Sequence, residues 1–183
     1  MGTTTKTRQE FKQVIFDFTR PADTTAYASG DVIANSTSAA TVMTFPNCAE
    51  PGKGGCIRSV LLMDGAAQAT KLNADLFLFS VTPVSYGNDN GAFVPTDAEM
   101  KNLIGVVSLD GTTAANLKVG DATVGDGGNV LIQQTGLAVP FQCAPGSASA
   151  GADSNLYGVL IARNAYTPVS AETFRVQLGI QVG

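Results

Sequence analysis

Residues 156–183 decide the fold class, and they read LYGVLIARNAYTPVSAETFRVQLGIQVG. Apolar residues alternate with polar ones or glycine over the last ten positions before the final glycine. The apolar members of this alternation are Phe174, Val176, Leu178, Ile180 and Val182. Strict alternation predicts a strand that buries one face. The run Leu156–Arg163 is apolar on both faces, which predicts a central strand covered on two sides.

Further runs of strand-forming residues precede this pair, separated by turn formers such as Asp64-Gly65 and Asp110-Gly111. They are Gln13–Arg20, Asp31–Ala34, Ala40–Pro46, Ile57–Asp64, Leu72–Thr82, Leu103–Leu109, Val130–Gln134 and Leu137–Cys143. Pro140 cannot donate a ladder hydrogen bond, so the last of these runs is predicted at a sheet edge. About ten short strands with such connections predict an all-β fold, an antiparallel β-sandwich of jelly-roll type.

One short helix is expected within PTDAEMKN, residues 95–102. Thr96 can cap its first turn, and Glu99, three residues later, can reach back to close a capping box. The sequence shows no internal repeat and no shift of composition that would mark a second domain. We therefore expect a single β-sandwich domain over residues 11–183, preceded by a polar arm over residues 1–10 that is flexible or becomes ordered on a partner.

Composition argues against several classes of protein. Charged residues make up 14% of the 183 residues, against about 25% in an ordinary soluble domain, and the net charge is −4. The absence of a basic cluster argues against nucleic-acid binding. The longest apolar run, Val60–Met63, is far shorter than the ~18 residues of a membrane-spanning helix, and the N-terminus has no signal-peptide core. We expect neither nucleic acid nor membrane as a partner.

The sequence contains no histidine, which removes every Ser-His and Cys-His catalytic pair and the commonest metal ligand. The three cysteines, Cys48, Cys56 and Cys143, are an odd number in a chain without a secretion signal. They are therefore predicted to be reduced, buried structural thiols. We predict no catalytic residue, no metal site and no cofactor.

Two alternatives depend on oxygen-bearing side chains. Asn88, Asp89 and Asn90 crowd a loop over residues 87–91, which could contact glycans, as in the jelly-roll module of a phage fibre or tail, or bind a surface calcium ion. A pair among the 15 acidic residues could serve a glycan hydrolase, which would need two carboxyl groups close together in a cleft.

Residues 18–35, FTRPADTTAYASGDVIAN, predict a rigid corner between strands. The ring of Pro21 ends the first strand, because it disfavours helical backbone at Arg20. An Asx-type turn begins at Asp23, and a second turn at Gly30-Asp31 precedes the next strand. Asp23 or Asp31 can neutralise Arg20, and Tyr27 is expected to fill the corner. The predicted structural site therefore comprises Arg20, Pro21, Asp23, Tyr27, Gly30 and Asp31.

Residues 18–35 and 156–183 together resemble a family of virion head proteins of tailed bacteriophages. The resemblance covers the two ends of the chain, and the middle only in its strand-rich character. It implies a capsid decoration (cement) protein that binds the outer head surface and stabilises the capsid lattice. It also implies a homo-oligomer, in the form of a trimer, partnered with the major capsid protein on the virion surface after synthesis in the host cytoplasm. No catalytic residues come with it.

Overall fold

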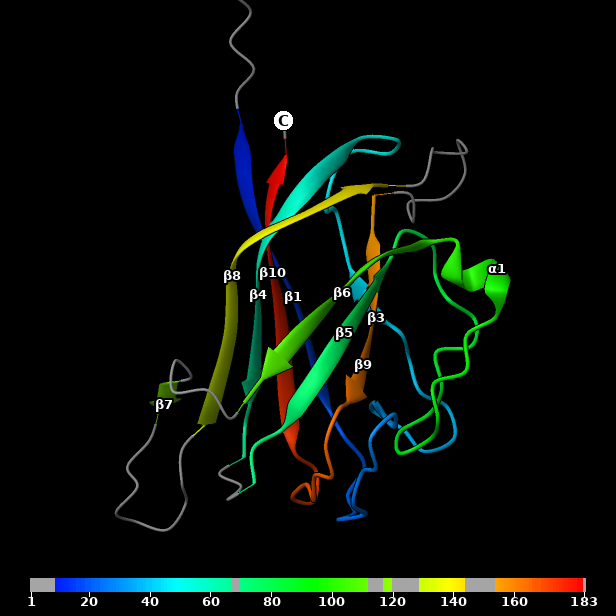
Figure 1. Ribbon diagram of the computed structural model, residues 1–183, viewed down its shortest axis with the longest axis vertical. Coiled ribbons are helices and arrows are strands. Elements are labelled where there is room, and N and C mark those ends of the chain that lie inside the picture. The colour runs from blue at the N-terminus through cyan, green and yellow to red at the C-terminus, as the bar shows by residue number, and fades with distance from the viewer. Residues whose placement is uncertain (1–8, 67–69, 112–116, 120–128, 144–153, 183) are drawn as a thin grey trace, which may run out of the picture.

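The computed structural model describes residues 9–66, 70–111, 117–119, 129–143 and 154–182 (Figure 1). The strands are β1 (Glu10–Thr19), β2 (Val32–Ile33), β3 (Met43–Phe45), β4 (Gly54–Asp64), β5 (Asn73–Phe79), β6 (Leu103–Asp110), β7 (Leu117–Val119), β8 (Asn129–Gln142), β9 (Leu156–Ala162) and β10 (Thr173–Val182). The helix α1 spans Asp97–Met100. The predicted arm lies almost wholly outside the described residues, so the division into arm and domain stays a prediction.

The strands form two antiparallel sheets, ordered β1-β10-β4-β8-β7 and β2-β9-β5-β6, with β3 also paired to β9. Strands from the two ends of the chain pair with each other, and the pairing continues inward. β1 pairs with β10, β2 with β9, β4 with β8 and β5 with β6. This nested pairing, divided between two packed sheets, is the jelly-roll arrangement. The predicted all-β sandwich of jelly-roll type with one short helix is confirmed.

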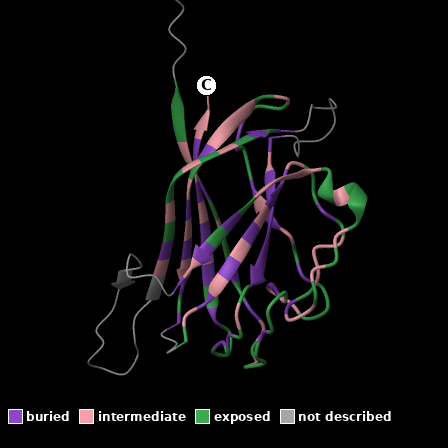
Figure 2. Ribbon diagram, viewed as in Figure 1, coloured by how far each residue is buried: buried purple, intermediate pink, exposed green. Residues whose placement is uncertain are grey.

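The core lies between the sheets and is made of buried residues from both, which are coloured purple in Figure 2. Leu178 and Val60 come from one sheet, Leu160 and Leu76 from the other, and all four are fully buried. Every residue of β9 is buried, as the doubly apolar run predicted. Its outward residues, such as Val159, pack in a second apolar cluster with residues of the connections that cover this sheet.

The outward face of the five-stranded sheet is different, because its side chains are exposed or half-buried. Neighbouring strands place Ile15 beside Gln177, and Gln177 beside Leu61. The next row holds Asp17 and Arg175, joined by an exposed ion pair of 2.6 Å. This face is therefore mostly uncharged, in keeping with the low charge of the whole chain.

The middle of the chain differs from the prediction in two ways: two predicted strands are one, and one short strand was not predicted. The runs Val130–Gln134 and Leu137–Cys143 form one strand, β8, which bulges against β4 where the register shifts between Ile57 and Ser59. Gly136 takes a φ of 70°, a left-handed conformation that glycine adopts without steric cost, so the strand continues through the bulge. Short β7 was not expected.

Pro140 lies where its missing N–H costs little. It is opposite Cys56 of β4, while the pairing of β7 with β8 covers only Asn129–Leu131. The far side of β8 at Pro140 is therefore a sheet edge within the described part of the chain, as predicted.

The helix is one turn long and carries the expected capping box, in which Thr96 and Glu99 bond reciprocally. Among the described residues, no helix has the length and hydrophobicity needed to cross a bilayer. All three cysteines are free thiols, but only Cys48 and Cys143 are buried. Cys56 is half-buried on β4, which corrects the prediction of three buried thiols.

Candidate functional site

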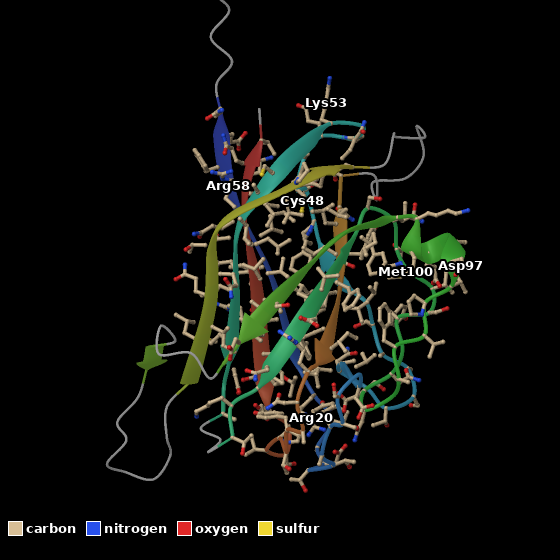
Figure 3. All side chains as sticks on the ribbon, in the orientation of Figure 1. Arg20, Cys48, Lys53, Arg58, Asp97 and Met100 are labelled. Atoms are coloured by element: carbon tan, nitrogen blue, oxygen red, sulfur yellow. The ribbon has the colours of Figure 1, made fainter. Side chains whose placement is uncertain are left out.

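The predicted corner closes one end of the sandwich, and Arg20 is its central residue (Figure 3). Arg20 directly follows β1, and its side chain has no exposed surface. Its guanidinium donates to Tyr27 Oη at 2.9 Å, to Asp23 Oδ1 at 3.0 Å and to Asp89 Oδ2 at 3.2 Å. A buried cation requires such partners, because an unpaired one would lose its hydration without compensation.

Asp89 is the partner that the sequence did not reveal. Its side chain is also fully buried, and it accepts from the Tyr27 hydroxyl at 2.6 Å and the Ala34 backbone N–H at 2.9 Å, besides Arg20. It is 69 positions away from Arg20 in the chain, and only the fold brings the two together. Nothing in the sequence near Asp89 distinguishes it from an ordinary Asx-rich turn.

The 87–91 loop is therefore hydrogen-bonded to the corner and helps to hold it in place. Both oxygens of Asp89 are engaged, and Asn88 Oδ1 accepts from the Ala40 N–H at 3.1 Å. These oxygens are the ones that a calcium ion or a glycan would need. The described residues contain no group of three or more Asp, Glu, Cys or His placed to hold a metal ion.

The remaining corner residues shape the backbone. The carbonyl of Pro21 accepts from the Asp23 N–H at 2.9 Å, and Asp23 Oδ1 accepts from the Thr25 N–H, also at 2.9 Å, which makes the predicted Asx turn. Gly30 has a φ of 100°, which side-chain-bearing residues rarely adopt. Asp31 accepts from the Ala28 N–H at 2.6 Å. Of the two acids considered for Arg20, the ion pair goes to Asp23.

A second buried polar cluster lies against the first, and it comprises Tyr166, Asp64 and Glu172. The ring of Tyr166 stacks on that of Tyr27, with centroids 6.4 Å apart. The Tyr166 hydroxyl lies 3.1 Å from Asp64 Oδ2 and also bonds Glu172 Oε1. Both carboxyl groups therefore face the same hydroxyl. This cluster joins the end of β4 to the β9–β10 connection.

The contacts of the Tyr166 hydroxyl favour a proton on one of these two carboxyl groups. A tyrosine hydroxyl has a single proton to donate, yet here it is within bonding distance of two carboxyl oxygens. Burial, together with the hydrogen bond and charge of Asp64, raises the pKa of Glu172 to about 8. Burial likewise raises the pKa of Tyr166 and of Tyr27. The cluster therefore holds a proton at neutral pH.

This acid pair has no access for a substrate. Asp64 is 1% exposed and Glu172 is 2% exposed, so the pair lies under the surface. A glycan hydrolase needs its two carboxyl groups on either side of a scissile bond. The buried thiol of Cys48 is also unsuited to chemistry, because burial raises its pKa to about 12.

The clearest exposed feature is on the β5–β6 connection, residues 80–102. Its exposed apolar side chains, here called the apolar platform, are Val81, Val84, Val94 and Met100, and Val84 is 85% exposed. The connection is held by the carboxylate of Glu99, which accepts from the N–H groups of Val84, Ser85 and Thr96 at 2.5, 2.6 and 2.8 Å. These bonds lower the pKa of Glu99 to about 2.

All four side chains come from one connection, which includes α1, and α1 carries Met100 (Figure 3). The sequence predicted the Thr96–Glu99 capping box but not this platform, because the exposure of a valine depends on what packs over it. The long connection between two apolar runs was the available signal.

No protein-family model matches this chain, and no curated protein matches it. Among solved structures, the chain is similar to a chain in the structure of Triatoma virus, with 10% sequence identity and a TM-score of 0.26. The match covers 96% of this chain and 66% of the other, so this chain spans about two thirds of its length.

Proposed function

We propose that this protein is a structural protein of a tailed-bacteriophage virion, a capsid decoration or cement protein that binds the outer surface of the head and stabilises the capsid lattice. Its partner is the major capsid protein, and its place is the virion surface. The role requires no catalysis and no cofactor. The phage assignment rests on the resemblance of residues 18–35 and 156–183 to that family.

The observation that carries the proposal is the apolar platform. Val84 is 85% exposed and Val94 is 70% exposed, on a connection that Glu99 holds in place. Apolar side chains fixed in this way lose little conformational freedom when a partner covers them. A charge-poor jelly roll with such a platform is suited to adhesion to another protein surface.

Attachment to a lattice also explains how a small docking surface would be enough for tight binding. A head displays the same docking point many times, so several linked copies of this protein would bind more tightly than one copy alone. The predicted trimer belongs to this proposal. A mass near three times 18.8 kDa in light scattering would support it.

The glycan-binding alternative loses its predicted contact, because Asp89 and the Asn88 side-chain oxygen are engaged within the corner. No other described feature favours it over adhesion to a capsid.

The proposal is tested by adding purified protein to expanded phage heads that lack it and measuring the bound fraction by sedimentation. We expect saturable binding to heads and none to isolated capsid subunits. Replacing Val84 and Val94 together with aspartate should weaken binding at least tenfold, because two charges would need to be desolvated at the contact.

Val106→Asp is the matched control, since Val106 is also exposed, at 42%, but lies on β6 outside the platform. It should bind like the wild-type protein. Failure of the wild-type protein to bind any assembled head would remove the proposed function. Equal binding by the platform variant and the control would remove the role of the platform.

A further inference from the structure

The outer edge of β1 is an unusual surface for a soluble protein. β1 is the terminal strand of its sheet, and no other described strand pairs with its outer side. Its ten residues pair with β10 in an unbroken register, from Glu10 opposite Val182 to Thr19 opposite Thr173. It contains no proline, no glycine and no bulge. Proteins usually protect long, flat edges with such features, because an open edge pairs readily with another strand.

The side chains along this edge are poorly protected by charge. On the outward face, Phe11 is 71% exposed and Ile15 is 42% exposed, with the neutral Gln13 between them. Lys12 is the single basic residue of β1, and its charge is compensated by Glu10 at 4.0 Å. A groove of about 510 Å³ runs beside this part of the strand, with Pro46 and Asn47 on its other side.

The sequence of β1 is suited to antiparallel pairing with a second copy of itself. If two copies of β1 pair antiparallel about a two-fold axis at Gln13, Phe11 of each copy lies opposite Ile15 of the other, and Gln13 lies opposite itself. Such a pairing keeps outward side chains on one face of the joined sheet. It covers residues 10–16, which include every residue of β1 that lines the groove. Cross-strand pairs between aromatic and β-branched side chains stabilise sheets.

We infer that the occupant of this edge is a second copy of the same chain, which pairs through β1 to make one continuous sheet across a two-fold axis. The contact is isologous, so each copy uses the same surface. The inference does not depend on the virion role. The contact by itself gives a two-fold pair, and it joins trimers only if a different surface forms them.

The first test is a cysteine cross-link at the axis. Residues directly opposite each other in an antiparallel pair have Cα atoms about 4.5–5.5 Å apart, which is within the range of a disulfide. Gln13→Cys should therefore give a covalent dimer on mild oxidation. Gln177→Cys is the matched control, because this residue lies on the same face but one strand further from the axis. The inference is wrong if Gln13→Cys forms no more covalent dimer than Gln177→Cys.

The second test is a charge on the edge. Ile15→Lys should weaken self-association at least tenfold, measured by light scattering across a dilution series. Val106→Lys should leave the association unchanged, since Val106 is as exposed as Ile15, at 42%, but lies on β6 in the other sheet. A wild-type protein whose mass stays that of a monomer or of a trimer at every concentration would overturn the inference, as would an Ile15→Lys variant that associates like wild type.

These outcomes are separate from the capsid assay. A protein that dimerises through β1 but ignores heads would overturn the virion role and leave this inference standing. If Ile15→Lys does not fold, the cross-link at the exposed Gln13 still decides.

Discussion

Replacing Asp89 with alanine is expected to lower the free energy of unfolding by about 3–5 kcal/mol, because it leaves the buried Arg20 guanidinium without its buried counterion. Asp23 remains as a partner of Arg20, but its side chain is 36% exposed, so it does not replace the buried counterion. The Tyr27 hydroxyl and the Ala34 N–H also lose their acceptor. Urea unfolding followed by circular dichroism measures the effect.

Asp17→Ala is the matched control, because it also removes an arginine–aspartate pair. Asp17 and Arg175 bond at 2.6 Å, but both are exposed, so solvent screens the pair and replaces its hydrogen bonds. We expect this variant to unfold close to wild type. Asp89→Asn keeps the shape and removes the charge, and should lie between the two. An Asp89→Ala protein as stable as the Asp17→Ala protein would contradict the stabilising role of the buried Arg20–Asp89 pair.

The protein is expected to become less stable as the pH rises from about 4.5 to about 8, and Glu172 is the cause. Its pKa is about 8 in the folded chain and 4.5 in the unfolded chain. Between these values the folded chain binds one proton that the unfolded chain has released, so the free energy of unfolding falls with pH. Glu172 contributes about 3–5 kcal/mol to the free energy of unfolding at low pH. This contribution is fully lost above pH 8.

Glu172→Gln should flatten this part of the stability profile. The amide nitrogen can donate to the Tyr166 hydroxyl, which then donates to Asp64, while the amide oxygen accepts the Val169 N–H that Glu172 Oε2 now accepts at 3.0 Å. Unfolding would be measured at pH 5 and pH 8.5 for both proteins.

Glu99→Gln serves as control for the pH dependence. The pKa of Glu99 is lowered to about 2, so its contribution is lost only as the pH falls below about 4.5. Above pH 5, the free energy of unfolding of the Glu99→Gln protein should change with pH as it does in the wild-type protein. A Glu172→Gln protein that keeps the full wild-type slope would show that another group binds the proton.

Much of the fold was predictable because its signals are local. The alternation over residues 173–182 became β10, the doubly apolar run became the fully buried β9, and the Thr96–Glu99 spacing became the capping box. Each signal acts within a few residues of itself. The break expected between the two halves of β8 was wrong, because Gly136 absorbs the bulge that a local pattern reads as a turn.

The site was predictable only in part. The turn from Asp23 and the contact between Asp23 and Arg20 lie within a few positions in the chain. Asp89, Tyr166 and Glu172 carried no local mark of their role. Whether a carboxylate is solvated or buried depends on which segments pack over it, and that is settled by the pairing of distant strands.

Composition and side-chain alternation were enough to establish a charge-poor, histidine-free β-sandwich, because both act without reference to distant residues. Three features depend on the tertiary structure alone: Arg20 meets Asp89, Asp64 and Glu172 face one tyrosine hydroxyl, and no described strand pairs with the outer side of β1. These features arise where strands remote in the chain come into register, and burial then fixes which polar groups must find each other.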